Sequence, residues 1–396
     1  MNMLKPQTLK GFRDFLPEEA RKRQYVINTW QKVFTLYGFE PLETPTLEYE
    51  EILTGKYGDE GDKLMYRFED HGKRRVAMRY DQTVPLARVI AQYQNEIAFP
   101  FKRYQIQPVW RADNTQRGRF REFVQCDIDT VGSETALADA EIVQVVEKAY
   151  EALGFKDFTI LVNDRQNFQG IDPKAIAIID KLKKIGPEAV ERELGQKGFD
   201  PNLLTEIRSR KQTENLMQII IQSGSKRVSY EPTLARGLDY YTGLIFEVEI
   251  VGYPVGSVCG GGRYDNLIGM FAKKPVPAVG CAFGFDRTLD AMSELDLFPK
   301  DLKTTTVLVT VFDQNLRAES LACVKLLREN GINAEIYLNP ETKMEKQLKY
   351  ANQKGVPYVV IIGTQEAEKN RLTLKNMQTG DQKQLALSEL PDVLKT

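Results

Sequence analysis

"FKRYQIQPVWRAD" at residues 101–113 and "REFVQCDIDTVG" at residues 121–132 are two β-prone runs separated by a polar stretch. Because that stretch contains "NTQRG" at 114–118, the pattern predicts two antiparallel strands joined by a loop. In the second strand Gln125, Asp127 and Asp129 alternate, so they share one face. Three polar positions on one face of an apolar region indicate a polar pocket floor that could hold an ammonium or another hydrogen-bonding ligand. An exposed strand edge is the alternative for Asp127 and Asp129.

The rest of the first 300 residues is consistent with a sheet built around this hairpin. Apolar spacing predicts helices at 18–37, 83–93 and 134–153. The stretch 55–63 is rich in Gly, Asp and Lys, and we expect a mobile loop there. Strand-like runs do not alternate regularly with these helices, so the pattern favours an antiparallel sheet flanked by helices, which is an α+β fold.

The character of the chain changes twice. From 165 to 226 it is rich in Lys, Glu and Ile at helical spacing, without strand signals, which predicts a helical insertion. After a second break near 298–306, strands and helices alternate, which predicts a separate α/β unit. The expected parts are therefore a core in two pieces with an insertion between them, followed by the last unit: 1–164, 165–226, 227–300 and 304–396.

Composition limits the classes of protein. The chain has 396 residues, of which 42% are hydrophobic and 28% charged, and its net charge is −1. A nucleic acid would therefore have to be held by local patches. One histidine and four scattered cysteines leave no plausible zinc site. No signal peptide or membrane-length apolar run is present in the sequence, so we expect a cytoplasmic protein.

Four arginines occupy positions where a surface charge would be wasteful. They are Arg111, Arg119, Arg236 and Arg287, and each has an acidic neighbour within three positions, at Asp113, Glu122, Asp239 and Asp286 respectively. These pairs could be structural salt bridges. Several guanidinium groups on one sheet would instead favour a polyphosphate clamp, because arginine binds phosphate oxygens bidentately.

The glycine cluster "CGGGRYD" at 259–265 has two interpretations. Glycines let backbone N–H groups approach a phosphate closely, but a tight turn would also explain them. No GxxxxGK[ST] sequence occurs, and no GxGxxG opens a helix, so neither a P-loop nor a dinucleotide-binding fold is indicated. No serine or cysteine pairs with the one histidine in a recognisable hydrolytic pattern.

These residues together resemble the class II aminoacyl-tRNA synthetases, and specifically the histidyl-tRNA synthetase family. "LYGFEPLETPTLE" at 36–48, the hairpin at 109–129 and "AVGCAFGFDRTLDAM" at 278–292 resemble the three class II motifs. "LARGLDYYTG" at 234–243 and "VCGGGRYDNLI" at 258–268 resemble sequences of the histidine enzymes and their close relatives. The resemblance implies a class II catalytic sheet, a homodimer formed through the first motif, and an anticodon-binding domain from 304 onward.

The resemblance also implies a role for each matching residue. Arg111 and Arg236 would be catalytic, flanking the α-phosphate during attack by the histidine carboxylate. Histidine would be bound by Asp81, Thr83, Arg111, Gln125, Asp129, Arg236, Tyr240 and Tyr241. ATP would be bound by Arg111, Asp113, Arg119, Phe123 and Arg287. The tRNA for histidine is the implied partner, and Mg²⁺ is implied by the polyphosphate, with no carboxylate assigned to it.

The sequence departs from the family pattern at three positions, and two rival interpretations stay open. Asp113, Asp129 and Asp286 stand where many family members have Glu, so each of these side chains is one methylene shorter. One rival is a paralogue that serves as a regulatory subunit of the first enzyme of histidine biosynthesis. Such paralogues resemble the core without the domain at 304–396. A more distant rival is a tRNA-sensing protein built from the same parts. The presence of Arg236 and of the last domain favours the synthetase.

Overall fold

A computed structural model describes residues 5–56, 58–115, 119–236, 240–271, 274–300 and 302–395. The chain divides into two compact units, Met1–Phe298 and Pro299–Thr396. Asp239, the acidic neighbour expected for Arg236, lies outside the described residues. None of the helices in the described ranges has the length and apolarity that a membrane crossing requires.

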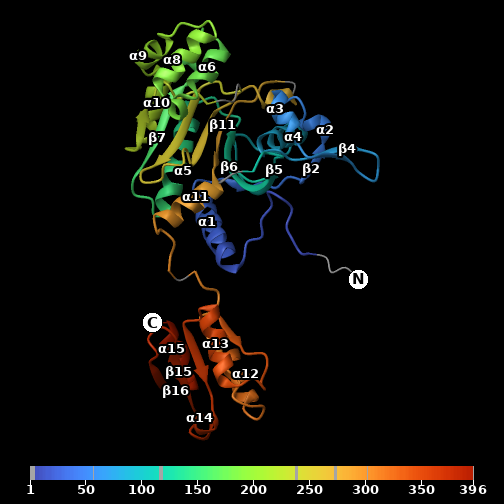
Figure 1. Cartoon of the computed structure of the whole chain (residues 1–396), viewed down its shortest axis with the longest axis vertical. Helices are drawn as coiled ribbons and strands as arrows, with labels where there is room; N and C mark the ends of the chain where they lie inside the picture. The colour runs from blue at the N-terminus through green and yellow to red at the C-terminus, as the bar shows by residue number, and fades with distance from the viewer. Residues whose placement is uncertain are drawn as a thin grey trace. The chain divides into compact units, whose positions relative to one another are not determined.

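The first unit is built on an eight-stranded sheet (Figure 1). The strand order is β1 (Glu40–Pro41), β5 (Phe101–Trp110), β6 (Glu122–Val131), β11 (Ala278–Phe283), β10 (Cys259–Arg263), β9 (Leu244–Ile250), β7 (Phe158–Asp164) and β8 (Val228–Tyr230). The strands from β5 to β7 pair antiparallel, and only the two outermost pairs, β1 with β5 and β7 with β8, are parallel. The predicted antiparallel sheet and its central hairpin are confirmed.

One apolar core against this sheet contains residues of α1 (Pro17–Leu36), α5 (Ala136–Ala152) and α11 (Phe285–Glu294), among others. Trp30 of α1 is fully buried, and its ring centroid lies 4.9 Å from that of Phe283 on β11. On β6, Cys126 and Ile128 belong to this core. Side chains alternate along a strand, so Gln125, Asp127 and Asp129 point to the opposite face.

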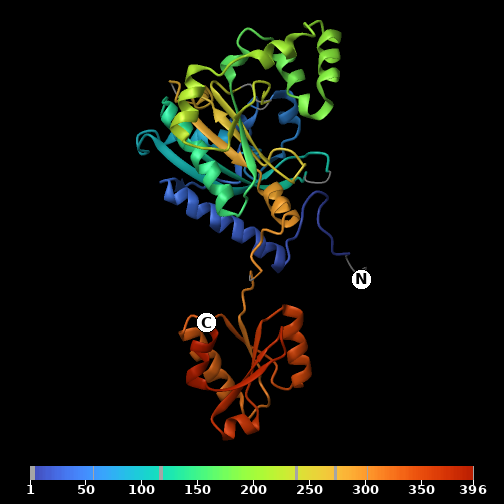
Figure 2. The same ribbon diagram turned by 90° about the vertical axis from the view of Figure 1, so that its left-hand side faces the viewer.

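The opposite face carries a second core. It combines α4 (Thr83–Gln92) and the short 3₁₀ turn η2 (Ile268–Met270) with residues of the insertion. The insertion contains η1 (Arg165–Phe168), α6 (Pro173–Ile179), α7 (Leu182–Ile185), α8 (Pro187–Gln196), α9 (Leu203–Ser209) and α10 (Glu214–Ser223). Residues 165–226 are all described and contain no strand. Figure 2 shows most of these helices gathered at one end of the unit. Leu216 and Ile219 of α10 instead pack into the first core.

A small three-stranded sheet, ordered β2 (Leu47–Tyr49), β4 (Arg75–Met78) and β3 (Arg67–Glu69), stands beside the main one with α2 (Glu50–Leu53). The expectation of a loop at 55–63 is wrong for its last six residues, because Gly58–Lys63 form the short helix α3. The Gly55 N–H donates to the Asp62 carboxylate at 2.9 Å. This local hydrogen bond joins the turn after α2 to the helix.

The second unit has a five-stranded sheet of its own. The order is β13 (Ala334–Ile336), β12 (Val307–Val309), β14 (Tyr358–Ile361), β15 (Arg371–Asn376) and β16 (Gln382–Ala386), with α12 (Arg317–Glu329), α13 (Met344–Lys354), α14 (Thr364–Glu368), η3 (Leu387–Glu389) and α15 (Leu390–Lys395). The first three strands are parallel and the last two antiparallel. Sequence reasoning found the alternation but missed β16, where only Leu385 is buried.

Candidate active site

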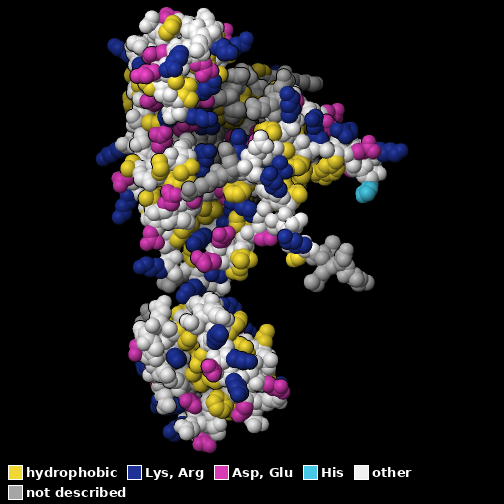
Figure 3. All heavy atoms as spheres, in the orientation of Figure 1, with side chains coloured by type: hydrophobic (Ala, Val, Ile, Leu, Met, Phe, Trp, Pro, Cys, Tyr) yellow, Lys and Arg dark blue, Asp and Glu magenta, His cyan; other side chains and the backbone are white. Residues whose placement is uncertain are grey.

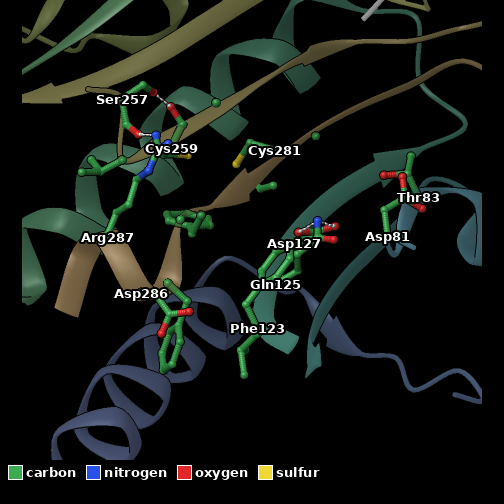
Figure 4. Close-up of a pocket in the computed structure, with 18 of the residues that line it drawn as sticks. Asp81, Thr83, Phe123, Gln125, Asp127, Ser257, Cys259, Cys281, Asp286 and Arg287 are labelled. Carbon is green, nitrogen blue, oxygen red and sulfur yellow. Dashed lines mark hydrogen bonds between the residues drawn. The ribbon is translucent and has the colours of Figure 1, made fainter. Parts of the chain in front are cut away.

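A cavity of about 450 Å³ opens on the face of the main sheet that carries Gln125, Asp127 and Asp129. It is lined by every residue that the sequence singled out for the site: Asp81, Thr83, Arg111, Asp113, Arg119, Phe123, Gln125, Asp129, Arg236, Tyr240, Tyr241 and Arg287. Figure 4 shows Gln125 and Asp127 on β6, with Asp81 and Thr83 to one side and Arg287 and Ser257 to the other. The structure thus brings these residues together, and their individual roles stay predictions.

The one histidine in the chain takes no part in this cavity. His71 lies in the turn between β3 and β4 (Figure 3), and it does not line the cavity. Figure 3 also shows Lys and Arg side chains interspersed with Asp and Glu on the visible face of each unit. The charges that line the cavity therefore indicate more about what the protein binds than the charges of the surface as a whole.

Arg111 is held at the end of β5 by two aromatic rings. Its Nε donates to the Tyr80 carbonyl at 3.0 Å. Its guanidinium carbon lies 4.4 Å from the Tyr80 ring centroid and 5.2 Å from that of Phe123. Stacking of this kind fixes the plane of a guanidinium without neutralising its charge.

Arg236 enters the cavity across the glycine strand. Its Nη1 donates to Glu247 Oε1 at 3.2 Å and to the Phe246 carbonyl at 3.4 Å. A Cβ on Gly260 would lie only 1.5 Å from that Nη1, so the guanidinium occupies the space that a side chain would fill. Burial acts to lower the pKa of Arg236, while Tyr241 and Glu247 together raise it above its ordinary value.

Two of the four acidic neighbours in sequence, Glu122 and Asp286, have other partners in space. Arg119 Nε lies 3.3 Å from Asp113 Oδ2, whereas Glu122 accepts from Trp110 Nε1 at 2.7 Å. Arg287 donates to the Ser257 carbonyl at 2.7 Å. Its neighbour Asp286 pairs instead with Arg13 and Arg23, at 2.9 and 2.8 Å.

The floor of the cavity is buried rather than an edge. The exposed-edge alternative is wrong, because β6 lies between β5 and β11, and Asp127 and Asp129 are only 3% and 4% exposed. The Gln125 amide nitrogen lies 3.4 Å from Asp127 Oδ1. Gln125, Asp127 and Asp129 therefore form a polar surface in the lining of the cavity.

Asp129 is held by two residues that sequence reasoning missed. Arg103, which is fully buried on β5 directly opposite Asp129, places its Nη2 at 2.6 Å from Asp129 Oδ2. The Tyr264 hydroxyl donates to Asp129 Oδ1. Gly280 on β11 leaves room for the carboxylate, since a Cβ there would lie 2.0 Å from Oδ1. An arginine inside a strand of the predicted hairpin is the signal that could have identified Arg103.

Burial governs the charge of this floor. It raises the pKa of Asp127 to about 8, with Arg103 acting in the opposite direction and Asp129 and Asp81 adding to the rise. Burial also raises the pKa of Asp129, although Arg103 and the Tyr264 hydroxyl favour its ionised form. Two buried carboxyl groups thus share Arg103, and Asp81 is near enough to raise the pKa of both, an arrangement that a cationic ligand would stabilise.

Aromatic rings close one side of the floor. The ring centroids of Tyr240 and Tyr241 are 4.8 Å apart, and Tyr240 meets Tyr264 edge-on at 5.9 Å. Burial raises the pKa of Tyr240 well above its usual value. Its hydroxyl therefore stays protonated at neutral pH and is able to donate or accept a hydrogen bond.

The glycine cluster is a strand, so the tight-turn interpretation is wrong. Cys259–Arg263 form β10 in the interior of the sheet. A Cβ on Gly261 would lie 2.2 Å from the Gly280 carbonyl, and one on Gly262 would lie 2.2 Å from the Leu244 carbonyl. Close approach of neighbouring strands therefore requires these glycines.

The antiparallel sheet flanked by helices is that of a class II aminoacyl-tRNA synthetase. The sequence model of "Histidyl-tRNA synthetase" matches residues 11–171 and 165–288, and that of "Anticodon binding domain" matches residues 306–396. The chain therefore belongs to the histidyl-tRNA synthetase family, a family of histidine–tRNA ligases, as the motifs predicted.

Similar proteins of full length support this assignment. A "Histidine--tRNA ligase" from Cytophaga hutchinsonii is 42% identical, over 98% of this chain and 99% of the relative. One from Phocaeicola vulgatus is 40% identical over 99% of each. The crystal structure of histidyl-tRNA synthetase from Nostoc sp. PCC 7120 superposes with a TM-score of 0.88 at 30% identity, and the match covers 99% of both chains.

Proposed function

We propose that this chain activates histidine with ATP in the cavity described above and then transfers the histidine to the 3′ end of its tRNA. In the first step a carboxylate oxygen of histidine attacks the α-phosphorus of ATP. The bond from that phosphorus to the bridging oxygen breaks, giving histidyl-adenylate and pyrophosphate. The observation that carries the proposal is that Arg111 and Arg236 line the same cavity as the acidic floor.

The two arginines suit the charge that this reaction develops. Both reactants are anionic, and the pentacovalent phosphorus gathers negative charge on its oxygens. Fixed guanidinium groups can stabilise that charge more than they stabilise the ground state. Arg111 is fixed by the rings of Tyr80 and Phe123, and Arg236 by Glu247. Their positions are therefore set before the substrates bind.

The floor supplies a site for histidine. Asp81, Thr83 and Gln125 would hold its ammonium and carboxylate ends. Asp129 would accept the imidazole N–H, because each carboxylate oxygen has a second lone pair beyond those that Arg103 and Tyr264 use. A hydroxyl of Tyr240 or Tyr241 would meet the other ring nitrogen. The Asp129 carboxylate and the tyrosine hydroxyl together match the hydrogen-bonding groups of the imidazole ring, which has one donor and one acceptor when neutral.

ATP would lie on the side of the cavity that Phe123 and Arg287 line, with its adenine against the Phe123 ring. Arg119, steadied by Asp113, would bind the polyphosphate from the β5–β6 loop. Mg²⁺ would accompany the polyphosphate. Within the described ranges no group of three or more His, Cys, Asp or Glu side chains fits a metal ion, so we assign it no protein ligand.

The chain would act as a cytoplasmic homodimer that binds its tRNA partly through residues 304–396. Support for the dimer comes from an exposed apolar surface beside the first class II motif. Leu47 is 41% exposed there, Tyr49 53% and Tyr93 39%. Together with Leu42 and Pro45 they line one broad hollow. Large apolar side chains gathered in this way are typical of an interface.

ATP–pyrophosphate exchange with each of the twenty amino acids tests the proposal. We expect exchange with histidine and with no other amino acid. The rival regulatory subunit would bind histidine without any exchange, so an absence of exchange would favour it. Exchange supported by a different amino acid would contradict the assignment of the acidic floor to histidine.

A further inference from the structure

The segment Leu9–Phe15, which we call the N-terminal latch, lies against the β5–β6 loop. The Gly11 carbonyl accepts the Arg121 N–H at 2.9 Å. A Cβ on Gly11, whose φ is +88°, would lie 2.7 Å from Arg121 Cγ and 2.9 Å from Thr115 Cγ2. The latch therefore contacts both sides of the loop that carries Arg119.

Arg13 of the latch joins that loop to α11. Its guanidinium carbon lies 3.2 Å from the centroid of the Phe120 ring, and its Nη2 lies 2.9 Å from Asp286 Oδ2. The second oxygen of Asp286 accepts from Arg23 of α1 at 2.8 Å. Arg13 thus touches the sequence neighbour of each of two cavity arginines, since Phe120 follows Arg119 and Asp286 precedes Arg287.

A second cavity, of about 470 Å³, shares four lining residues with the active-site cavity: Arg119, Phe120, Asp286 and Arg287. Arg13 and Arg23 lie on the wall of this second cavity. Arg13 thus contacts the wall that the two cavities share. Arg119 is only partly supported by its own ion pair, because its side chain is 57% exposed although its Nε lies 3.3 Å from Asp113 Oδ2. A long side chain on a loop needs support from its surroundings to keep one orientation.

We propose that Arg13 is a positioning residue for ATP, which sets Arg119 and Arg287 through Phe120 and Asp286. The inference rests on the proposed function in one respect, namely that these two arginines bind the nucleotide. Arg13 itself does not line the active-site cavity. Its effect should therefore fall on the binding of ATP and spare the binding of histidine, whose site is built on β6.

The test is kinetic, on the full chain. We expect Arg13→Ala to raise the KM for ATP about tenfold, which is what loss of a charge-assisted hydrogen bond supplies. The KM for histidine should stay within about twofold. Arg13→Lys, which keeps the charge near Asp286 but loses the flat stack on Phe120, should fall between Arg13→Ala and the unmodified chain. Lys10→Ala is the matched control, because Lys10 is an exposed cation of the same latch.

A double-mutant cycle with Phe120→Leu separates positioning from a merely structural role. If Arg13 acts through Phe120, Arg13→Ala should raise the KM for ATP less in the Phe120→Leu background than in the unmodified chain. Equal rises in both backgrounds, or equal rises in KM for ATP and for histidine, would overturn the proposal. A lower unfolding free energy with unchanged ATP affinity would overturn it as well.

Direct titration with a non-hydrolysable ATP analogue distinguishes failure of this inference from failure of the proposed function. If the unmodified chain binds the analogue but exchanges no pyrophosphate with histidine, the proposed function fails. The inference about Arg13 is still tested in that case, because the analogue should bind about tenfold more weakly to Arg13→Ala than to Lys10→Ala. Equal affinity of those two variants for the analogue would overturn the positioning role of Arg13 and leave the proposed function intact.

Discussion

Replacing Gly260 by Ala would test the role of Arg236 without altering Arg236. The new Cβ would lie 1.5 Å from Arg236 Nη1, 2.5 Å from Cζ and 2.9 Å from Nη2. These three closest atoms all belong to the end of one flexible side chain. The fold can therefore be retained while the guanidinium is expelled from its position between Glu247 and the cavity.

The size of the effect follows from the distance that the guanidinium must move. Ordinary van der Waals contact begins at 3.4 Å, so Nη1 must shift by about 2 Å. A misplacement of ~1 Å at a reacting centre can cost about 10²-fold, and loss of one donor to the developing charge costs ~10²–10³-fold. We expect Gly260→Ala to lower the exchange rate by about 10²–10³-fold, with the KM for histidine and ATP changed only a few-fold.

The assay is ATP–pyrophosphate exchange, with Gly195→Ala as the matched control. Gly195 lies in α8, and a Cβ there meets nothing closer than Pro201 Cγ at 3.4 Å. Because Gly260→Ala and Arg236→Ala remove the same interaction, the double variant should be no slower than Arg236→Ala alone. An exchange rate for Gly260→Ala within threefold of the unmodified chain, or additive losses, would refute the reasoning.

Three further predictions concern the floor of the site and the second unit. Asp129→Ala should raise the KM for histidine by about 10²-fold and leave the KM for ATP within threefold. It should also lower the free energy of unfolding by about 3–5 kcal/mol, because Arg103 stays buried without its carboxylate partner. Equal small effects on both KM values in exchange assays would place Asp129 outside the site. The pKa of Asp127 is about 8 in the folded chain against an ordinary 3.8, so between these pH values the folded state binds a proton that the unfolded state has lost. The free energy of unfolding should therefore fall as pH rises through that window, by about 1.4 kcal/mol per pH unit. In urea unfolding at pH 5, 7 and 9 the fall should be shallower for Asp127→Asn, and an equal fall in the variant would contradict the raised pKa of Asp127. A chain ending at Lys303 should keep exchange and bind its tRNA more weakly in a filter-binding assay, whereas unchanged affinity would show that residues 304–396 do not contact the tRNA.

The elements and the membership of the site were predictable from the sequence because they depend on local patterns. Alternation over 121–132 identified β6 and the shared face of Gln125, Asp127 and Asp129, which lines the cavity. Helical spacing identified α1 and α5 to within about two residues at either end. Local periodicity reports which face of an element is buried.

The partners of the charged residues were not predictable, because they depend on strand register and chain crossing. Arg103 and Asp129 meet across the β5–β6 pair, and Tyr264 reaches Asp129 from 135 positions away. Adjacent residues such as Asp286 and Arg287 suggested a pair, but successive side chains on a helix point about 100° apart. For Arg119 and Arg287, proximity in sequence therefore identified the charge correctly and its partner incorrectly.

Glycines provide the link between the sheet and the charges buried in it. Arg236 occupies the space above Gly260 on β10, and Asp129 occupies the space above Gly280 on β11. In an antiparallel sheet neighbouring strands lie about 4.8 Å apart, so a side chain that lies directly over the next strand occupies space that a Cβ on that strand would fill. The positions of one proposed catalytic charge and one proposed recognition charge thus depend on a glycine in the neighbouring strand. A site fixed in this way needs little reorganisation when its substrates bind, which is the condition under which a fixed charge favours the transition state over the ground state.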